Sequence, residues 1–137
     1  MTVENKTLVS VRIYHEDTDS GGVVYHANYL RYMERARTEW LRDRGFDHDR
    51  VAREAGILFV VRSVEIKFLR PARLSDLLVA SAELVKINHG LMVFDQRIMN
   101  HDVELARATV RVISVSVSDF KSVGISDQLK QDWVVNL

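Results

Sequence analysis

The sequence has no cysteine, and that absence excludes several kinds of chemistry at once. A chain without thiols forms no disulfide, offers no thiolate ligand to a metal and has no cysteine nucleophile. The lack of disulfides suits a reducing compartment. The first residues show no charged start followed by a long apolar stretch, so we expect no secretory signal. No apolar run reaches the roughly 18 residues of a membrane-spanning helix. We therefore expect a cytoplasmic protein without a membrane span.

An excess of charge of one sign is missing as well. The 19 basic and 19 acidic side chains give a formal net charge of zero, whereas nucleic-acid-binding proteins usually carry a basic surface. We therefore expect no nucleic-acid partner. Several familiar catalytic signatures are also absent, because no nucleophile elbow, H-E-x-x-H zinc motif, dinucleotide fingerprint or phosphate loop occurs. An active site in this chain has to be built from other elements.

Hydrophobic patterning predicts a domain of the α+β class. Residues 8–14 alternate and are rich in β-branched side chains, which predicts a strand. Apolar residues then recur at helical spacing from about residue 28 to residue 44, and a shorter helical pattern covers residues 47–55. Long strands are expected at residues 58–69, 77–87, 91–99 and 103–118, with a last short helix at residues 126–133.

One long helix with many apolar positions needs a sheet to cover it. The expected architecture is therefore a curved antiparallel sheet around a central helix. A chain of 137 residues is long enough for one such core. A sheet of this kind leaves edge strands, which commonly pair between subunits. We therefore expect a homo-oligomer, either a dimer or a tetramer.

The side chains best suited to catalysis lie in one short stretch, Glu16–Leu30, which reads EDTDSGGVVYHANYL. Its glycine pair allows a sharp turn and a close approach to a ligand. The backbone amides near Tyr25 and His26 stand at the start of the long helix, where unpaired N–H groups can hold an oxyanion. A carboxylate beside them can attack an acyl carbon or activate water. Asp19 is better placed for this than Asp17, because it comes directly before the turn.

A structural interpretation of the same residues stands beside the catalytic one. Acidic side chains often cap turns and helix starts, and spacing alone favours that role for Asp17 and Asp19. A metal site is disfavoured, because alternation points neighbouring side chains to opposite faces of an extended segment. A lone histidine such as His26 is more often structural. Glu34 and Arg37 have the i, i+3 spacing of a helix-surface ion pair, although Arg37 lies near the apolar arc and could be partly buried at a subunit contact.

A longer motif connects this stretch to a known family. The run of residues 14–46, YHEDTDSGGVVYHANYLRYMERARTEWLRDRGF, closely resembles the acyl-CoA thioesterases of the hot-dog fold. Within that fold it is similar to the 4-hydroxybenzoyl-CoA thioesterase-like group, and in particular to the bacterial Tol–Pal-associated thioesterases. A weaker resemblance continues through FVVRSVEIKFLRPARLSD and the later strands. The resemblance implies one hot-dog domain over residues 1–137, with a long helix wrapped by an antiparallel sheet.

The resemblance also implies roles for individual residues. Asp19 would be the catalytic carboxylate, acting as nucleophile or as general base. The backbone amide of His26 would polarise the thioester carbonyl. A second hot-dog arrangement uses a carboxylate within the central helix, for which Glu34 would be the candidate. The expected substrate-binding residues are Gly22, Tyr25 and Asn28 around the turn, with Arg62 and Lys67 for the coenzyme A phosphates and Lys86 as a further basic candidate.

The basic pair is proposed because the hairpin of residues 88–90 lacks the basic cluster that some relatives use for these phosphates. The predicted function is hydrolysis of an acyl-CoA to a free acid and coenzyme A, without a metal or an organic cofactor. One alternative is a non-catalytic scaffold that binds acyl groups or acyl carrier protein at the cell envelope. Another is a hydratase or dehydratase on the same fold. Turnover of any acyl-CoA would exclude the scaffold, and hydration of an enoyl-CoA without cleavage would favour the hydratase.

Overall fold

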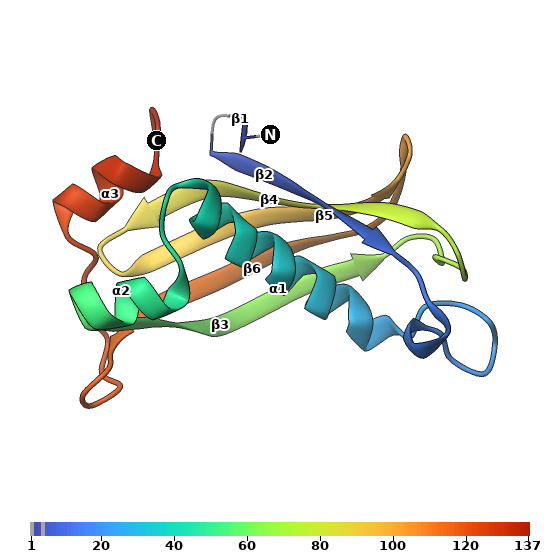
Figure 1. Cartoon of the computed structure of the whole chain (residues 1–137), viewed down its shortest axis with the longest axis horizontal. Coiled ribbons are helices and arrows are strands. Elements are labelled where there is room, and N and C mark those ends of the chain that lie inside the picture. Colours follow the sequence, from blue (N-terminus) through green and yellow to red (C-terminus); the bar gives the residue numbers. More distant parts are fainter. Residues whose placement is uncertain (1, 4) are drawn as a thin grey trace.

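The computed structural model describes residues 2, 3 and 5–137, which form one sheet, three α-helices and a short 3₁₀ helix, η1 (His15–Asp17) (Figure 1). The order of elements follows the sequence prediction, with one long helix early in the chain and long strands after it. In chain order the elements are β1 (Thr2–Val3), β2 (Lys6–Arg12), α1 (His26–Asp43), α2 (His48–Ala55), β3 (Ile57–Phe68), β4 (Leu77–Asn88), β5 (Leu91–Asn100), β6 (Val103–Ser116) and α3 (Asp127–Trp133). Among these described residues, no helix is long and apolar enough to cross a membrane.

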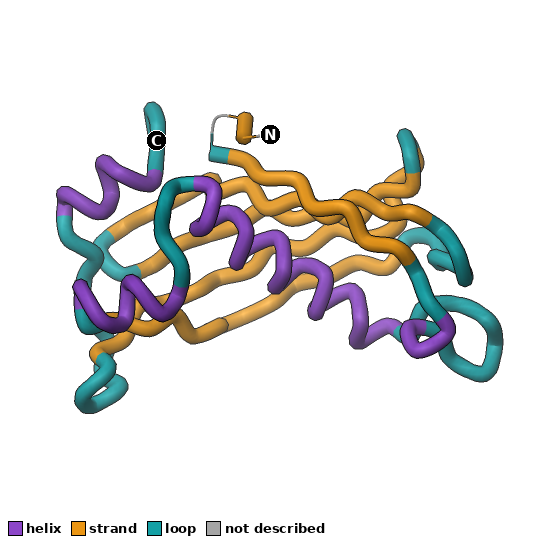
Figure 2. The backbone as a smooth tube through the Cα atoms, viewed as in Figure 1, coloured by secondary structure: helices purple, strands orange, loops and turns teal. Residues whose placement is uncertain are grey.

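The strands form one antiparallel sheet in the order β1-β2-β4-β5-β6-β3. The sheet curves around α1, which crosses it diagonally and packs on β2, β4 and β5 (Figures 1 and 2). The expected architecture, a curved antiparallel sheet around a central helix, is confirmed. Strand β3 pairs only with β6, so its other side is a free edge of the sheet.

Large side chains of the helix pack against the sheet where several of the sheet residues are small. The predicted apolar stripe of α1, Tyr29, Met33, Ala36 and Trp40, is buried. The facing strands contribute alanines that are also buried, at positions 80, 82, 106 and 108. Small residues let the helix lie close to the sheet, so that the aromatic rings of α1 fill the space between the two layers.

A β-bulge interrupts β3 between Val61 and Ser63 and leaves Arg62 without a partner in β6. Val61 pairs with Val112 and Val64 pairs with Val110, and both partners are buried core residues. Val61 and Val64 therefore both face the helix side of the sheet, although residues three positions apart in a regular strand would face opposite sides. The unpaired Arg62 accounts for the difference.

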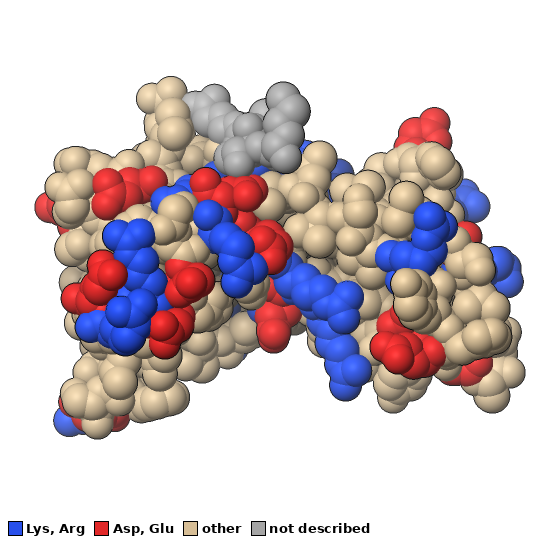
Figure 3. All heavy atoms as spheres, in the orientation of Figure 1, with Lys and Arg blue, Asp and Glu red and all other residues tan. Residues whose placement is uncertain are grey.

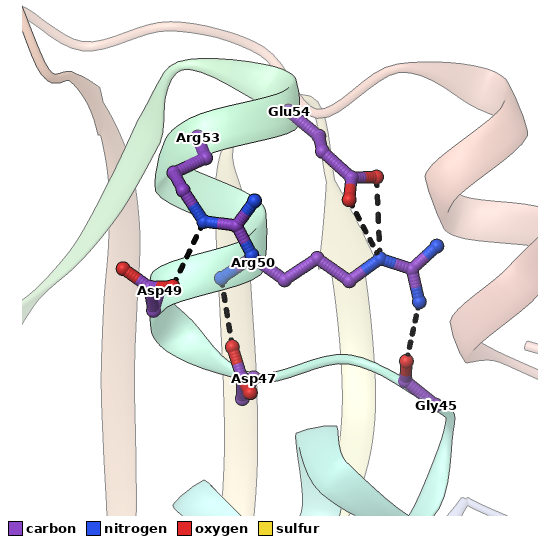
Figure 4. Close-up of polar contacts among 6 residues, drawn as sticks. All are labelled: Gly45, Asp47, Asp49, Arg50, Arg53 and Glu54. Atoms are coloured by element: carbon purple, nitrogen blue, oxygen red, sulfur yellow. Dashed lines mark hydrogen bonds and ion pairs between the residues drawn. The ribbon is translucent and has the colours of Figure 1, made fainter.

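Helix α2 is held by its own polar side chains, as Figure 4 shows. The Asp47 side chain accepts a hydrogen bond from the Arg50 amide at 2.7 Å, which confirms the predicted N-cap. Arg50 pairs with Glu54 and Arg53 with Asp49, each at i, i+4 spacing. In the space-filling view these side chains form a cluster of both signs at the left of the molecule (Figure 3). Their mutual pairing leaves α2 with few free charges.

Asn5 ties three distant parts of the chain together. Its side-chain amide donates to the Val135 carbonyl at 2.6 Å, and its side-chain oxygen accepts from the Val135 amide at 2.8 Å. Its own carbonyl accepts from the Trp40 indole at 2.9 Å. Asn5 has a left-handed backbone with φ of 58°, which asparagine tolerates better than most residues.

We predict that Asn5→Ala lowers the free energy of unfolding by about 2–3 kcal/mol. The variant loses two partly buried hydrogen bonds and places alanine in a left-handed conformation. Urea denaturation measures the change, and Ser10→Ala, on the exposed surface of β2, is the control and should change stability by less than about 0.5 kcal/mol. An Asn5→Ala midpoint equal to that of the wild type would show that Asn5 does not hold these segments.

Candidate active site

The acidic stretch folds into a compact loop between β2 and α1, at the right-hand end of Figure 1. Thr18 and Val24 form an isolated antiparallel bridge across its base. Within it, the Asp19 amide donates to the Val23 carbonyl at 2.8 Å, and the Gly22 amide donates to the Asp19 carbonyl at 3.1 Å. Gly22 has φ of +78°, a left-handed conformation that explains glycine at this position. The turn predicted from the glycine pair is therefore present.

Asp19 lies on the exposed part of this loop. Its Oδ1 atom accepts a hydrogen bond from the Gly21 amide at 2.8 Å. No described residue donates a hydrogen bond to its Oδ2 atom. The turn-capping role that spacing favours is thus real, but it uses one oxygen and leaves the other for chemistry.

Asp17 has a different function, because it connects the loop to the start of α1. Its carbonyl oxygen accepts hydrogen bonds from the Tyr25 amide and from the buried Asn28 side chain, each at 2.9 Å. Its side-chain Oδ2 atom accepts from the Tyr14 amide at 2.8 Å. These contacts assign Asp17 and Asn28 to holding the loop. Asp19 differs because its carboxylate is exposed and its one hydrogen bond stays within its own turn.

The first turn of α1 supplies free hydrogen-bond donors. Tyr25 is the N-cap residue, and its carbonyl accepts from the Asn28 amide at 2.9 Å. Within the described chain, no acceptor binds the amides of His26 and Ala27. Because the Tyr25 amide is already bonded to Asp17, the free donors are those of His26 and Ala27. They lie at the positive end of the longest helix, where an anion or a developing oxyanion is favoured.

A pocket of about 280 Å³ opens beside this helix start. Phe68 forms one wall, with its ring centroid 6.1 Å from that of His26 and 5.5 Å from that of Tyr29. The Tyr29 hydroxyl accepts a hydrogen bond from the Ala72 amide at 3.0 Å and so fixes the chain that follows β3. The lining residues are Val24, His26, Tyr29, Phe68, Leu69, Arg70 and Pro71.

Sequence reasoning identified His26 but not the Phe68–Leu69 wall of this pocket. The available signal was a pair of large apolar residues just before the only proline of the chain, but nothing in the sequence places them beside α1. Asp19, Gly22, Tyr25 and Asn28 belong to the adjoining loop and do not line this pocket.

The two basic residues expected to contact the coenzyme A phosphates do not line the pocket beside His26. Arg62 is the exposed residue of the β3 bulge. Lys67 lines a cavity of about 500 Å³ with Arg97 and Arg107. It lies on the sheet face opposite α1, because its neighbour Phe68 points toward α1 and side chains alternate along a strand. Arg70 is the basic residue that lines the pocket beside His26.

The prediction of a surface ion pair between Glu34 and Arg37 is wrong. No ion pair joins these side chains in the described chain. The Arg37 guanidinium instead turns inward, and its Nη1 atom donates to Oε1 of Gln96 on β5 at 2.9 Å. The expectation that Arg37 is partly buried is confirmed.

Two buried tyrosines lie beneath the loop. Burial raises the pKa of Tyr32, and the nearby Asp17 carboxylate raises it further. Among the residues that the structure describes, no acceptor has hydrogen-bond geometry to the Tyr32 hydroxyl, so the influence of Asp17 is electrostatic rather than a formed bond. Burial also raises the pKa of Tyr29, against a smaller opposite effect of its bond to Ala72.

These shifts predict loss of stability in alkali. Both groups keep their protons to a higher pH in the folded chain than the ordinary tyrosine value of 10.0. The folded state therefore binds more protons than the unfolded state above about pH 10, and the free energy of unfolding falls as the pH rises. Urea denaturation at about pH 9 and about pH 11 should show this fall, and Tyr32→Phe should reduce it. Tyr14→Phe, whose ring is exposed, is the control. Equal pH dependence in wild type and Tyr32→Phe would contradict the assignment.

The architecture defines the class of protein. A long helix wrapped by a curved antiparallel sheet is the fold of the hot-dog thioesterases. The probable thioesterase of Bartonella henselae has this structure, with a TM-score of 0.83 and 33% identity over 88% of this chain and 99% of its own.

Comparison of sequences gives the family. The model of the thioesterase superfamily matches residues 21–107. The acyl-CoA thioesterase YbgC of Haemophilus influenzae is 39% identical over 128 residues, which cover 93% of this chain and 94% of that protein. The acyl-CoA thioester hydrolase YbgC of Escherichia coli O157:H7 is 44% identical over 106 residues, covering 77% and 78%. The chain therefore belongs to the thioesterase superfamily, and the expectation of a thioesterase-type enzyme is confirmed.

Proposed function

We propose that this protein hydrolyses an acyl-CoA thioester to a carboxylic acid and coenzyme A, with Asp19 as the catalytic carboxylate. One observation carries the proposal. A single loop holds Asp19 with one oxygen unbonded and leads directly into a helix whose amides at His26 and Ala27 are free. The names of the YbgC relatives support acyl-CoA as the substrate class.

Two routes of hydrolysis are compatible with this arrangement. Asp19 could attack the carbonyl carbon and expel the coenzyme A thiolate, leaving a mixed anhydride that water then cleaves. It could instead take a proton from a water molecule that attacks the same carbon. In both routes the carbonyl oxygen gains negative charge, which the His26 and Ala27 amides stabilise. Neither route uses a metal or an organic cofactor.

The other expected substrate-binding residues either shape the site around the thioester or bind the charged coenzyme A phosphates. Gly22 gives the turn its left-handed backbone, and Asn28 fixes the loop against α1. Tyr25 is half exposed next to His26 and is proposed to border the bound thioester. For the coenzyme A phosphates, Arg70 is the favoured residue, because it lines the pocket. Contacts from Arg62 and Lys67 stay predictions.

We predict that Asp19→Asn lowers kcat by about 10³-fold or more. The amide oxygen of asparagine can still accept the Gly21 hydrogen bond, so the loop keeps its shape, but the side chain can neither attack nor take a proton. Release of free thiol from short, long and aromatic acyl-CoAs measures the effect. The matched control is Glu34→Gln, the carboxylate of the second hot-dog arrangement, which should retain activity within a few-fold. Full activity in Asp19→Asn with loss in Glu34→Gln would exchange the two roles.

The same assay addresses the alternative functions. If the wild type binds acyl-CoAs or acyl carrier protein but releases no thiol from any of them, the non-catalytic scaffold replaces the hydrolase. Hydration of an enoyl-CoA without thiol release would instead indicate the hydratase. A cytoplasmic location and an association with the Tol–Pal system stay predictions of the sequence resemblance.

We further propose that the chain forms a homodimer or homotetramer through β3. This strand is a free edge with 12 residues, and exposed edges of this length readily pair with another strand. Its apolar side chains remain accessible on the helix side, with Val61 at 45%, Val64 at 36% and Phe68 at 48% exposure. A second copy would cover both the backbone edge and these side chains.

Val64→Lys should therefore shift the protein toward monomers, because a lysine on this strand opposes burial against a second copy. Sedimentation velocity at several protein concentrations measures the change. Leu8→Lys is the control, since Leu8 is similarly exposed at 47% but lies on β2, far from β3 in the strand order. An unchanged oligomer in Val64→Lys with dissociation of Leu8→Lys would move the interface to the other side of the sheet.

A further inference from the structure

Arg37 places a positive charge inside the apolar contact between α1 and the sheet. Its Nη1 atom donates to Oε1 of Gln96 at 2.9 Å, and Gln96 is fully buried. The Gln96 amide nitrogen is already used by the carbonyls of Met33 and Ser81, at 2.9 and 3.1 Å. Gln96 thus accepts one hydrogen bond from the guanidinium, but as a neutral group it does not balance the charge.

The guanidinium has no anionic partner among the described residues. No carboxylate forms an ion pair with it, although Glu34 lies close enough to act on its charge through space. A guanidinium has five N–H donors, and the bond to Gln96 uses one of them. The side chain is half-buried, and a partly desolvated cation is favoured by an anionic acceptor. The unused N–H groups of Arg37 are therefore available to an acceptor from outside the described chain.

A groove leads to this group from the surface. It has a volume of about 490 Å³ and lies between α1, α2 and β3. Below it lies a small apolar recess of about 40 Å³, walled by Trp40, Leu41, Met92 and Phe94. Arg37, His48, Phe59 and Val112 line both spaces, so the guanidinium stands where the open groove meets the apolar recess.

Several of the other charges around the groove are paired within the chain. Arg42 pairs with Glu39, and Asp49 pairs with Arg53. Asp47 is occupied as the N-cap of α2 (Figure 4). Glu34 also lines the groove and forms no ion pair among the described residues.

Of the two arginines that line the groove in the described chain, Arg37 is the one without a carboxylate partner. The imidazole of His48 and the hydroxyl of Thr38 lie on the same walls.

The position of Arg37 connects this groove to the proposed catalytic loop. It follows His26 by eleven residues, which brings it to nearly the same face of α1, about 16 Å further along the helix. Strand β3 runs beside this face from Phe59 at the groove to Phe68 at the pocket next to His26. Between those ends, the helix-facing side of β3 presents the exposed apolar side chains of Val61 and Val64.

We propose that Arg37 selects the acyl group of the substrate by binding a carboxylate at its far end. The thioester lies at His26, the apolar chain follows β3, and the distal carboxylate binds the unused N–H groups of Arg37, which suit a paired interaction with two oxygens. The substrate class is then an ω-carboxyacyl-CoA, the monothioester of a dicarboxylic acid. This inference rests on the proposed function.

The test compares two substrates that differ only at the distal end, decanedioyl-CoA and decanoyl-CoA, with shorter and longer pairs to cover chain length. For each enzyme the measured quantity is the ratio of the two kcat/KM values, which does not depend on the fraction of folded protein. We expect the wild type to prefer the ω-carboxy substrate and Arg37→Met to lower the ratio at least tenfold. Arg42→Met, on the wall of the same groove and paired with Glu39, should leave the ratio unchanged. A ratio that is the same in wild type and Arg37→Met overturns the inference and leaves the hydrolase intact.

A binding measurement separates this inference from the proposed function. Trp40 lines the apolar recess, so its fluorescence reports occupancy without turnover, and Trp40→Phe identifies its signal against that of Trp133. If the wild type cleaves no acyl-CoA, the proposed function fails, and binding of free decanedioate to wild type but not to Arg37→Met still supports the anion site. Equal binding of decanedioate and decanoate overturns it.

A carboxylate of a second copy is the competing partner for Arg37. In that case Arg37→Met would dissociate the oligomer in sedimentation and leave the substrate ratio unchanged, which also overturns the inference.

Discussion

Two hydrogen bonds to the Asp17 carbonyl oxygen, from the Tyr25 amide and the Asn28 side chain, determine the geometry of the candidate site. They fix where α1 begins, and they withdraw the Tyr25 amide from any contact with a ligand. The next two amides are therefore the first free donors of the helix. The same bonds hold the loop that carries Asp19 against the helix start. One backbone oxygen thus positions both the carboxylate and the donors that the proposed reaction requires.

The helix that begins there is a continuous link between two chemically different ends. At its start are free amides and an exposed carboxylate, and eleven residues later its inner face carries the half-buried guanidinium of Arg37. The sheet side of this interface is mainly apolar, and Gln96 is a fully buried polar residue within it. An apolar pair of similar size would fill the same space with a smaller desolvation cost, so the polar pair does not serve stability. Recognition of a polar substrate end would explain why it is there.

Much of the fold could be predicted from the sequence, because it depends on local periodicity. The stripe from Tyr29 to Trp40 has helical spacing, and Asp47 and Gly56 are residues that favour the start and the end of a helix. Contacts between distant residues could not be predicted in this way. Arg37 turns inward because Gln96, 59 positions later, offers an acceptor there, and spacing along α1 indicated only Glu34. Similarly, the pairing of β3 with β6 rather than with a nearer strand follows from the topology of the whole sheet.

The bulge at Arg62 has a consequence for how this chain tolerates changes in length. Because side chains alternate along a strand, the extra residue sits outside the ladder, and both halves of β3 keep their apolar side chains on the helix side. Without Arg62, Ser63 alone would lie between Val61 and Val64 opposite Arg111, and the ladder would be regular with Phe68 still facing the helix. Deletion of a paired residue beyond the bulge, such as Glu65, would instead turn Ile66 and Phe68 to the opposite face. The bulge is therefore a place where β3 can lose a residue, whereas the paired stretch that leads to Phe68 is not.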